Sequence, residues 1–325
     1  MASTRFRALA TTAVAALALC TACSSDSSGS SDASSADKPL KLAVFASLNG
    51  VPAFAADEEG VFGKHGLDVE IGTAKTSTEM VPQLLGGKVN LALLDTATSL
   101  VAAGQGVDLV YVAAATDGGI PEGQEDFSFA NVWVKKNSPI KSLADLTGKT
   151  VGVPQIKSAP WVDLRGSVDE AGGDSSTIKF VESPDPLAAL KSGQVDATTT
   201  PEPVGTVERA KGELHPLGPV NSGGGGSAYV WVTTRAFADA NKDIVKAFAE
   251  AVREGNKAVN DDRDLLVRTA AEVLGADAEL LEKAAFPVYA EKPLTKDDIE
   301  FSVEYMNKYD MFEKAAPDAG KLILP

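Results

Sequence analysis

The chain has 325 residues, which is enough for a substantial hydrophobic core and for two domains. Its 45 acidic residues outnumber 30 basic ones, giving a formal net charge of −15. Nucleic-acid binding needs a basic face, so we expect no nucleic acid among its partners. The acidic balance by itself indicates only a well-solvated surface.

The N-terminus has the pattern of an export signal. Arg5 and Arg7 precede an apolar run over 8–19, which suits a signal peptide but is short for a membrane span. Cys20-Thr-Ala-Cys23 then resembles a bacterial lipobox, whose cysteine receives a lipid after cleavage just before it. Because the small Ala22 precedes Cys23, we expect 1–22 to be the signal peptide and Cys23 to be lipidated. An ordinary secretory signal with incidental cysteines is the alternative.

The cysteines support an anchored protein. Both lie within 20–23, so the rest of the chain can form no disulfide, no thiol nucleophile and no cysteine-ligated metal site. The serine-rich stretch 23–38 has no apolar periodicity, so we expect a flexible tether that holds a domain off the membrane.

Strands and helices alternate at short intervals through the first part of the folded chain. Strands are expected at 40–45, 67–71, 89–95 and 108–115, and helices at 53–62 (ending at Gly63), 76–85 and 97–103. The spacing of Thr76 and Glu79 predicts a capping box at the start of the second helix. Such alternation is typical of α/β proteins with mostly parallel sheets.

The same pattern starts again in the second part. Strands are expected at 131–135, 149–153, 177–181, 195–199 and 228–234, and helices at 142–146, 158–171, 184–192 and 202–211. The glycine-rich stretch 221–227 is expected to be mobile. An apolar stripe over 237–259 and shorter helices at 261–274, 277–285 and 296–309 are expected to cover the first lobe.

A repeated helix–glycine–strand unit indicates two similar lobes. The segment 84–95 repeats the pattern of 187–203, with Gly87, Val89 and Asn90 standing where Gly193, Val195 and Asp196 stand. We expect a first lobe made of 39–132 and 228–325 and a second lobe of 133–227. A single continuous domain with an exposed glycine-rich loop is the alternative.

Enzyme signatures are scarce. The only histidines, His65 and His215, lie far apart without a metal-binding partner nearby, and both are interpreted as surface residues. Gly148-Lys-Thr150 lacks the upstream glycine of a phosphate-binding loop, and no G-x-S-x-G elbow or dinucleotide fingerprint is present. We therefore expect no catalytic residue, no metal and no cofactor.

Polar residues instead gather at predicted strand ends and helix starts, which meet at the cleft of a two-lobed sheet protein. The candidate ligand-binding residues are Asn49, Lys75, Ser77, Asp95, Thr96, Thr116, Asp117, Gln155, Lys157, Ser158, Trp161 and Glu202. Asp95-Thr96 and Pro201-Glu202-Pro203 are expected to face each other across that cleft, and Trp161 could stack on a planar ligand.

Four ordered segments resemble the nitrate/sulfonate/taurine-type solute-binding lipoproteins of ABC importers, a group that also resembles thiamine-pyrimidine synthases. They are 55–70, the repeated Gly-x-Val-Asn/Asp unit, 142–153 and Glu202-Pro203. The resemblance implies a two-lobed type II periplasmic-binding fold that closes over one small solute. It also implies docking onto a membrane permease that works with an ATPase. The expected product of the gene is a lipid-anchored, monomeric extracytoplasmic receptor.

The resemblance leaves the solute open. Lys75 and Lys157 favour a sulfonate or carboxylate anion, while Asp95, Asp117 and Glu202 fall in the same region. The synthase relatives are implied to use an iron-binding cysteine cluster, which cannot form here because the chain has no cysteine after Cys23. A binding protein for a thiamine-pyrimidine precursor, an enzyme on the same scaffold and a cell-wall adhesion or scaffold protein are the alternatives.

Overall fold

The computed structural model describes residues 39–323, so the predicted signal peptide, the tether and Cys23 lie outside the described residues. Its strands are β1 Leu40–Phe45, β2 Val69–Ala74, β3 Leu91–Asp95, β4 Leu109–Gly119, β5 Ala130–Lys135, β6 Thr150–Val153, β7 Lys179–Glu182, β8 Ala197–Pro201, β9 Leu214–Pro219 and β10 Ser222–Thr234. Its α-helices are α1 Val51–Glu58, α2 Val61–Lys64, α3 Ser77–Leu85, α4 Thr96–Gly104, α5 Ala159–Glu170, α6 Pro186–Ser192, α7 Val204–Lys211, α8 Arg235–Ala240, α9 Lys242–Asp261, α10 Arg263–Leu274, α11 Ala278–Leu281, α12 Lys296–Lys308 and α13 Ala319–Leu322. Short 3₁₀ turns are η2 Leu48–Gly50, η3 Ala144–Leu146 and η4 Ser175–Thr177.

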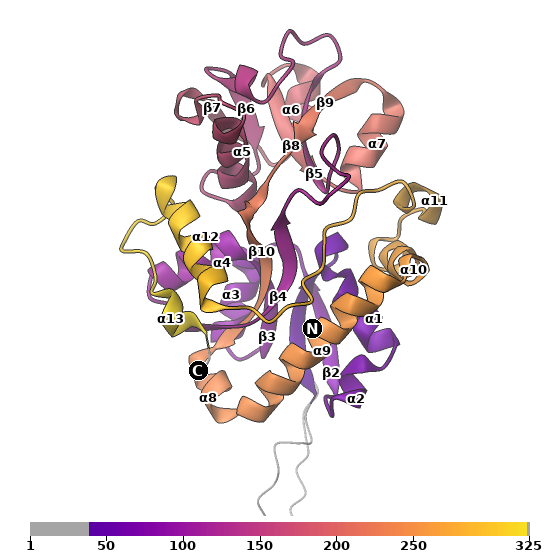
Figure 1. The fold of residues 1–325 in the computed structure, drawn as a ribbon, viewed down its shortest axis with the longest axis vertical. Helices are drawn as coiled ribbons and strands as arrows, with labels where there is room; N and C mark the ends of the chain where they lie inside the picture. Colours follow the sequence, from indigo (N-terminus) through magenta and orange to yellow (C-terminus); the bar gives the residue numbers. More distant parts are fainter. Residues whose placement is uncertain (1–38, 324–325) are drawn as a thin grey trace, which may run out of the picture. The chain divides into compact units, whose positions relative to one another are not determined.

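The strands form two five-stranded sheets with the same spatial arrangement of parallel and antiparallel strands (Figure 1). The first has the order β2-β1-β3-β10-β4, with β1 parallel to β2 and β3, and β10 antiparallel to both its neighbours. The second has the order β7-β6-β8-β5-β9, with β6 parallel to β7 and β8, and β5 antiparallel to both its neighbours. The α/β class and the duplicated architecture predicted from the repeat are therefore confirmed.

Two helix starts follow directly from the sequence. Thr76 caps α3, because the Glu79 amide donates to its Oγ1 at 3.2 Å, and Glu79 in turn accepts from the Lys75 amide at 3.0 Å. Asp95 caps α4 by accepting from the Thr98 amide at 2.8 Å. These side chains satisfy amide groups that the first turn of a helix leaves free. The N-terminus predicted near Thr76 is confirmed.

The helix expected at 53–62 is instead two helices. It breaks after Glu58, where Gly60 adopts the left-handed conformation (φ 67°) that glycine tolerates better than other residues. The second piece, α2, packs Phe62 against Phe248 of α9, with ring centroids 5.9 Å apart. Val61 and Phe62 of this second helix are both buried in the core.

The glycine-rich stretch is the start of β10, so the expected beginning of the strand at 228 was wrong. β10 begins at Ser222, and its backbone pairs with β4 from Gly119 to Leu109 through several bulges. Gly223, Gly224 and Gly225 all have positive φ values, and a Cβ on Gly224 would lie 2.6 Å from the Tyr305 ring. Glycine is required here because the strand bends past an aromatic ring.

The C-terminal helices largely cover the first sheet, as expected. α9 buries Val245, Phe248, Val252 and Val259 along one face and packs against α1 and β4. Helix α12 also reaches the second lobe, which was not predicted. The Tyr305 hydroxyl donates to the Val162 carbonyl oxygen of α5 at 3.1 Å.

The chain passes between the sheets through 120–129 and again at 220–221. Val132, expected in the first lobe, belongs to β5 of the second sheet, and Gly223, expected in the second lobe, belongs to β10 of the first. The lobe boundaries themselves stay a prediction. Within residues 39–323 no helix is both long and apolar enough to cross a membrane.

Candidate functional site

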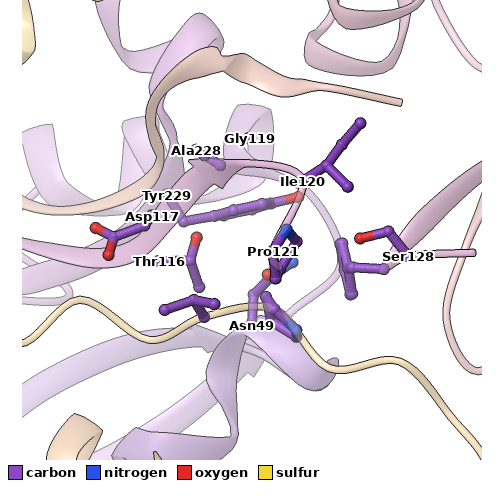
Figure 2. A pocket seen from close by; sticks show the side chains of 13 residues that line it. Asn49, Thr116, Asp117, Gly119, Ile120, Pro121, Ser128, Ala228 and Tyr229 are labelled. Carbon is purple, nitrogen blue, oxygen red and sulfur yellow. The ribbon is translucent and has the colours of Figure 1, made fainter. Parts of the chain in front are cut away.

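Two adjoining cavities lie where the two sheets meet. The first has a volume of about 240 Å³ and the second about 120 Å³, and they share Phe129, Ala228 and Tyr229. The first is lined by Asn49, Thr116, Asp117, Gly118, Gly119, Ile120, Pro121, Ser128, Phe129, Ala228, Tyr229, Pro287 and Val288 (Figure 2). The second takes its other walls from Ala130, Pro154, Ala159, Pro160, Asp163, Thr199, Pro201 and Val220. Such a mostly apolar recess with a few polar groups is the usual form of a small-molecule site.

Asn49 enters the first cavity from the turn after β1. A hydrogen bond fixes the turn η2: the buried Tyr289 hydroxyl donates to the Leu48 carbonyl oxygen at 2.7 Å. Gly50 fits only because it has no side chain, since a Cβ there would lie 2.1 Å from the Phe45 carbonyl oxygen. Asn49 is 5% exposed, and its Oδ1 has no hydrogen-bond partner among the described residues. A buried amide oxygen of this kind is suited to accept a hydrogen bond from a ligand.

Thr116 and Tyr229 meet across neighbouring strands. Their backbones pair in register on β4 and β10, and Tyr229 also pairs with Asp95 of β3. In Figure 2 the Thr116 hydroxyl points toward the Tyr229 ring. Phe45 packs edge-on against that ring, with centroids 5.6 Å apart, and so fixes its position. Thr116 Oγ1 is buried without a partner in the described part of the chain.

Asp117 lies at the edge of the same cavity. Figure 2 shows its carboxylate directed away from Thr116 and Asn49. Partial burial raises the pKa of the Asp117 carboxyl, and Lys292 opposes that rise. Asn49, Thr116 and Asp117 are thus three predicted residues that the structure brings to one cavity.

Helix α5 supplies the wall from the second lobe. Asp163 is 8% exposed, and its Oδ1 accepts from the Gly223 amide at 2.9 Å. Burial raises the pKa of the Asp163 carboxyl well above its usual range; the Gly223 hydrogen bond opposes the rise, and the Asp95 carboxylate adds to it. Asp163 also lines a small third cavity of about 20 Å³ together with the predicted Thr96, whose Oγ1 is buried without a described partner.

Several predicted residues line none of these three cavities. Lys75, Gln155 and Lys157 are exposed. Ser77 is buried and accepts from the Asp95 amide at 2.9 Å, so the two residues join α3 to the end of β3. The Ser158 hydroxyl donates to the Gln155 carbonyl oxygen at 2.6 Å within its own turn.

Trp161 packs inside the second lobe. Its ring lies 5.6 Å from Phe180 between centroids, and the Arg165 guanidinium lies over it at 4.8 Å. Only 7% of the residue is exposed, and it lines none of the three cavities. The neighbouring Ala159 and Pro160 form the cavity wall in its place.

Glu202 turns away from the cavities and toward α7. Its Oε2 accepts from the Thr206 amide at 3.1 Å, and the residue is 3% exposed. Its neighbour Pro201 does line the second cavity, opposite Tyr229, whose backbone pairs with Asp95. Pro201 of the second motif thus lines a cavity, while Glu202 holds the start of a helix, and the expectation that Glu202 and Asp95 face each other across the cleft stays a prediction.

Glu202 predicts a pH dependence of stability. Burial raises the pKa of its carboxyl to about 6, from 4.5. The folded state then holds the proton more tightly than the unfolded state, so the stabilising contribution is complete below about pH 4.5 and is lost by about pH 6. Relative to Glu202→Gln, the wild-type free energy of unfolding should fall by about 1 kcal/mol across this window, after allowance for solvent screening. Urea denaturation at several pH values measures it.

The control is Glu213→Gln, which removes an exposed carboxylate from the same lobe. It should keep the wild-type pH profile. A Glu202→Gln variant whose stability changes in parallel with the wild type between pH 4.5 and 6 would contradict the assignment.

Three important cavity residues were not predicted from the sequence. Phe129 precedes β5 in the crossing segment, Tyr229 lies within β10, and Asp163 lies within the predicted helix 158–171. The sequence offered one indication of this site: the glycine-rich stretch 221–227 is followed by Ala228 and Tyr229, which both line the cavities. In residues 39–323 no group of three or more histidine, cysteine, aspartate or glutamate side chains is placed to hold a metal ion.

Solved structures similar to this one include periplasmic binding proteins. The periplasmic aliphatic sulphonate-binding protein SsuA from Escherichia coli superposes with a TM-score of 0.71 at 19% identity, over 88% of this chain and 92% of that one. The periplasmic nitrate-binding protein NrtA from Synechocystis PCC 6803 gives 0.66 at 14% identity, over 88% and 86%. The fold is therefore the two-lobed type II periplasmic-binding fold, as the sequence predicted.

A family model described as NMT1/THI5 like matches residues 47–264, and the chain belongs to this family. Among curated proteins, the taurine-binding periplasmic protein of Escherichia coli (strain K12) is 27% identical over 204 residues. That match spans 62% of this chain and 60% of the relative's length.

Proposed function

We propose that this protein is the extracytoplasmic solute-binding component of an ABC importer. One observation carries the proposal: the second cavity is lined from both lobes, by Tyr229 of β10 on one side and by Pro160 of α5 and Thr199 of β8 on the other. A solute held there would contact both lobes at once, so closing the lobes would enclose it. The family and the named functions of the similar proteins support the same role.

The proposal also covers where the protein acts and where its solute goes. The solute-loaded protein would dock onto a membrane permease that works with an ATPase and would release the solute to it. It would act as a monomer without catalysis, and a lipid on Cys23 would hold it at the outer face of the cell membrane. The serine-rich segment 24–38 would give it reach between the membrane and the permease.

Thermal melting against a solute panel tests the binding role. The panel should contain alkyl sulfonates, taurine, carboxylates, nitrate and pyrimidines, the classes raised by the sequence and the comparisons. A solute present at about 100 times its dissociation constant should stabilise the protein by about 2.7 kcal/mol. Turnover of any solute, with or without added iron, would instead favour an enzyme.

The anchor has a test with a built-in control. Cys23→Ser should prevent lipid attachment and release the protein from the membrane fraction, because a Ser side chain offers no thiol for the lipid. Cys20→Ser, three positions upstream, should leave the protein in the membrane fraction. Cell fractionation followed by mass spectrometry of the N-terminal peptide measures both. Equal release of the two variants would contradict the assignment of Cys23.

A further inference from the structure

The residues that line the three cavities include carboxylates but no basic side chain. Asp117 borders the first cavity, and Asp163 borders the other two. None of the lining residues is lysine, arginine or histidine. The lysines expected from the sequence to hold an anion, Lys75 and Lys157, are exposed and line none of them. The only carboxyl or basic side chains that line these three cavities are therefore those of Asp117 and Asp163.

Asp163 has the geometry of a ligand-binding carboxylate. It is 92% buried, and in the described part of the chain the one hydrogen bond of its side chain is the contact between Oδ1 and the Gly223 amide. The side chain lines two cavities, and its second oxygen is left for another donor. Burying an ionised carboxylate without a positive partner is strongly unfavourable, so a cation in the cavity would remove that cost.

The aromatic side chains of the site also favour a positively charged solute. Tyr229 and Phe129 line both of the larger cavities, and Tyr229 shares the second with Asp163. The face of an aromatic ring attracts a cation, and amines bound in proteins are often held between such rings and a carboxylate. Asn49 Oδ1 and Thr116 Oγ1, both without described partners, add acceptors for N–H groups.

We propose that the solute carries a cationic amine, which pairs with the free oxygen of Asp163 and lies against the ring of Tyr229. This inference rests on the proposed binding function and specifies its ligand. The amine is the recognised group, whether or not the solute also carries an acid group elsewhere. Asp163 is thus the residue that selects the solute by charge.

The raised pKa of Asp163 gives a second consequence. Burial raises the pKa of the Asp163 carboxyl and a paired amine would lower it, so the empty site should bind a proton more tightly than the loaded site. The titratable groups that face Asp163 are Asp95 on β3, Tyr229 on β10 and Tyr305 on α12, and none of them is basic. Binding of an amine should therefore release a proton and should strengthen as pH rises through the pKa of Asp163.

Matched probes and variants test the proposal. The intact protein is titrated by calorimetry with propylamine and benzylamine, with propanesulfonate and benzenesulfonate, and with taurine, which carries both charges. Asp163→Asn keeps the acceptor for the Gly223 amide but removes the charge. Asp185→Asn is the control, because it removes one carboxylate from the same lobe and asparagine still caps α6.

We expect amine-bearing probes to bind the wild type and Asp185→Asn, and to bind Asp163→Asn at least about 10-fold more weakly, a loss of about 1.4 kcal/mol. Titrations in two buffers with different ionisation heats should show proton release that Asp163→Asn lacks. An amine-free sulfonate that binds wild type and Asp163→Asn equally would overturn the inference while leaving the binding function intact. Failure of every probe would count against both.

Discussion

Replacing Gly50 with alanine is expected to be among the most damaging single changes in this protein. The added Cβ would lie 2.1 Å from the Phe45 carbonyl oxygen and 2.7 Å from Val44 Cγ1. Phe45 belongs to β1, which is paired on both sides, so its backbone cannot move without disturbing β2 or β3. Overpacking against fixed backbone is one of the few mechanisms that give large effects, and we expect a loss of about 3 kcal/mol or more.

The same substitution should also weaken solute binding, because Asn49 precedes Gly50 in the turn that lines the first cavity. Gly63→Ala is the matched control. A Cβ at Gly63, within α2, meets no atom within 4 Å, and alanine favours the helix by up to about 1 kcal/mol. Chemical denaturation of both variants measures the contrast. Equal stabilities would mean that the turn after β1 relaxes freely.

Trp133→Ala should give the second large effect, this time in the second lobe. Trp133 lies on β5, is fully buried and packs edge-on against Phe127 with centroids 6.1 Å apart. It contributes to a small core with Ala189, Leu190, Val195 and Leu214. Truncation of a buried tryptophan leaves a large cavity, so we expect a loss of about 3–5 kcal/mol.

Two further variants separate packing from hydrogen bonding at this position. The Trp133 indole nitrogen is buried without a partner in residues 39–323, so Trp133→Phe removes an unsatisfied donor and should cost less than Trp133→Ala. Phe301→Ala removes an aromatic ring that is 44% exposed on α12 and should cost about 1 kcal/mol or less. Urea unfolding followed by circular dichroism ranks the three. A Trp133→Phe variant as unstable as Trp133→Ala would show that the indole makes an essential contact.

The features predicted correctly from the sequence depend on local chemistry. Thr76 caps the helix that follows it because its side chain reaches an amide only three residues away. Asn49, Thr116 and Asp117 were expected at the ends of predicted strands, and the structure places all three on one cavity. Their role in ligand binding stays a prediction. Neither inference needs knowledge of distant parts of the chain.

The features that were missed depend on partners far away in the sequence. β9 contains Pro216, Gly218 and Pro219, which disfavour a strand, yet it forms at the sheet edge by pairing with β5. Asp163 and Tyr229 lie inside regular elements, and only the packing of α5 against β10 turns them toward one cavity. Lys75 and Lys157 lie near predicted helix starts, as other candidate residues do. The sequence alone could not show that these two side chains are exposed and line none of the three cavities.

The position of β10 in the first sheet has a consequence for biosynthesis. This strand fills the space between β3 and β4, but it is translated only after the whole of the second sheet. Until it emerges, the inner edges of β3 and β4 lack their partner, so the first sheet cannot be completed on the ribosome. Pairings this distant in sequence form slowly. A nascent chain that cannot complete its fold early stays unfolded for longer, and an unfolded chain is the form that can be translocated across a membrane.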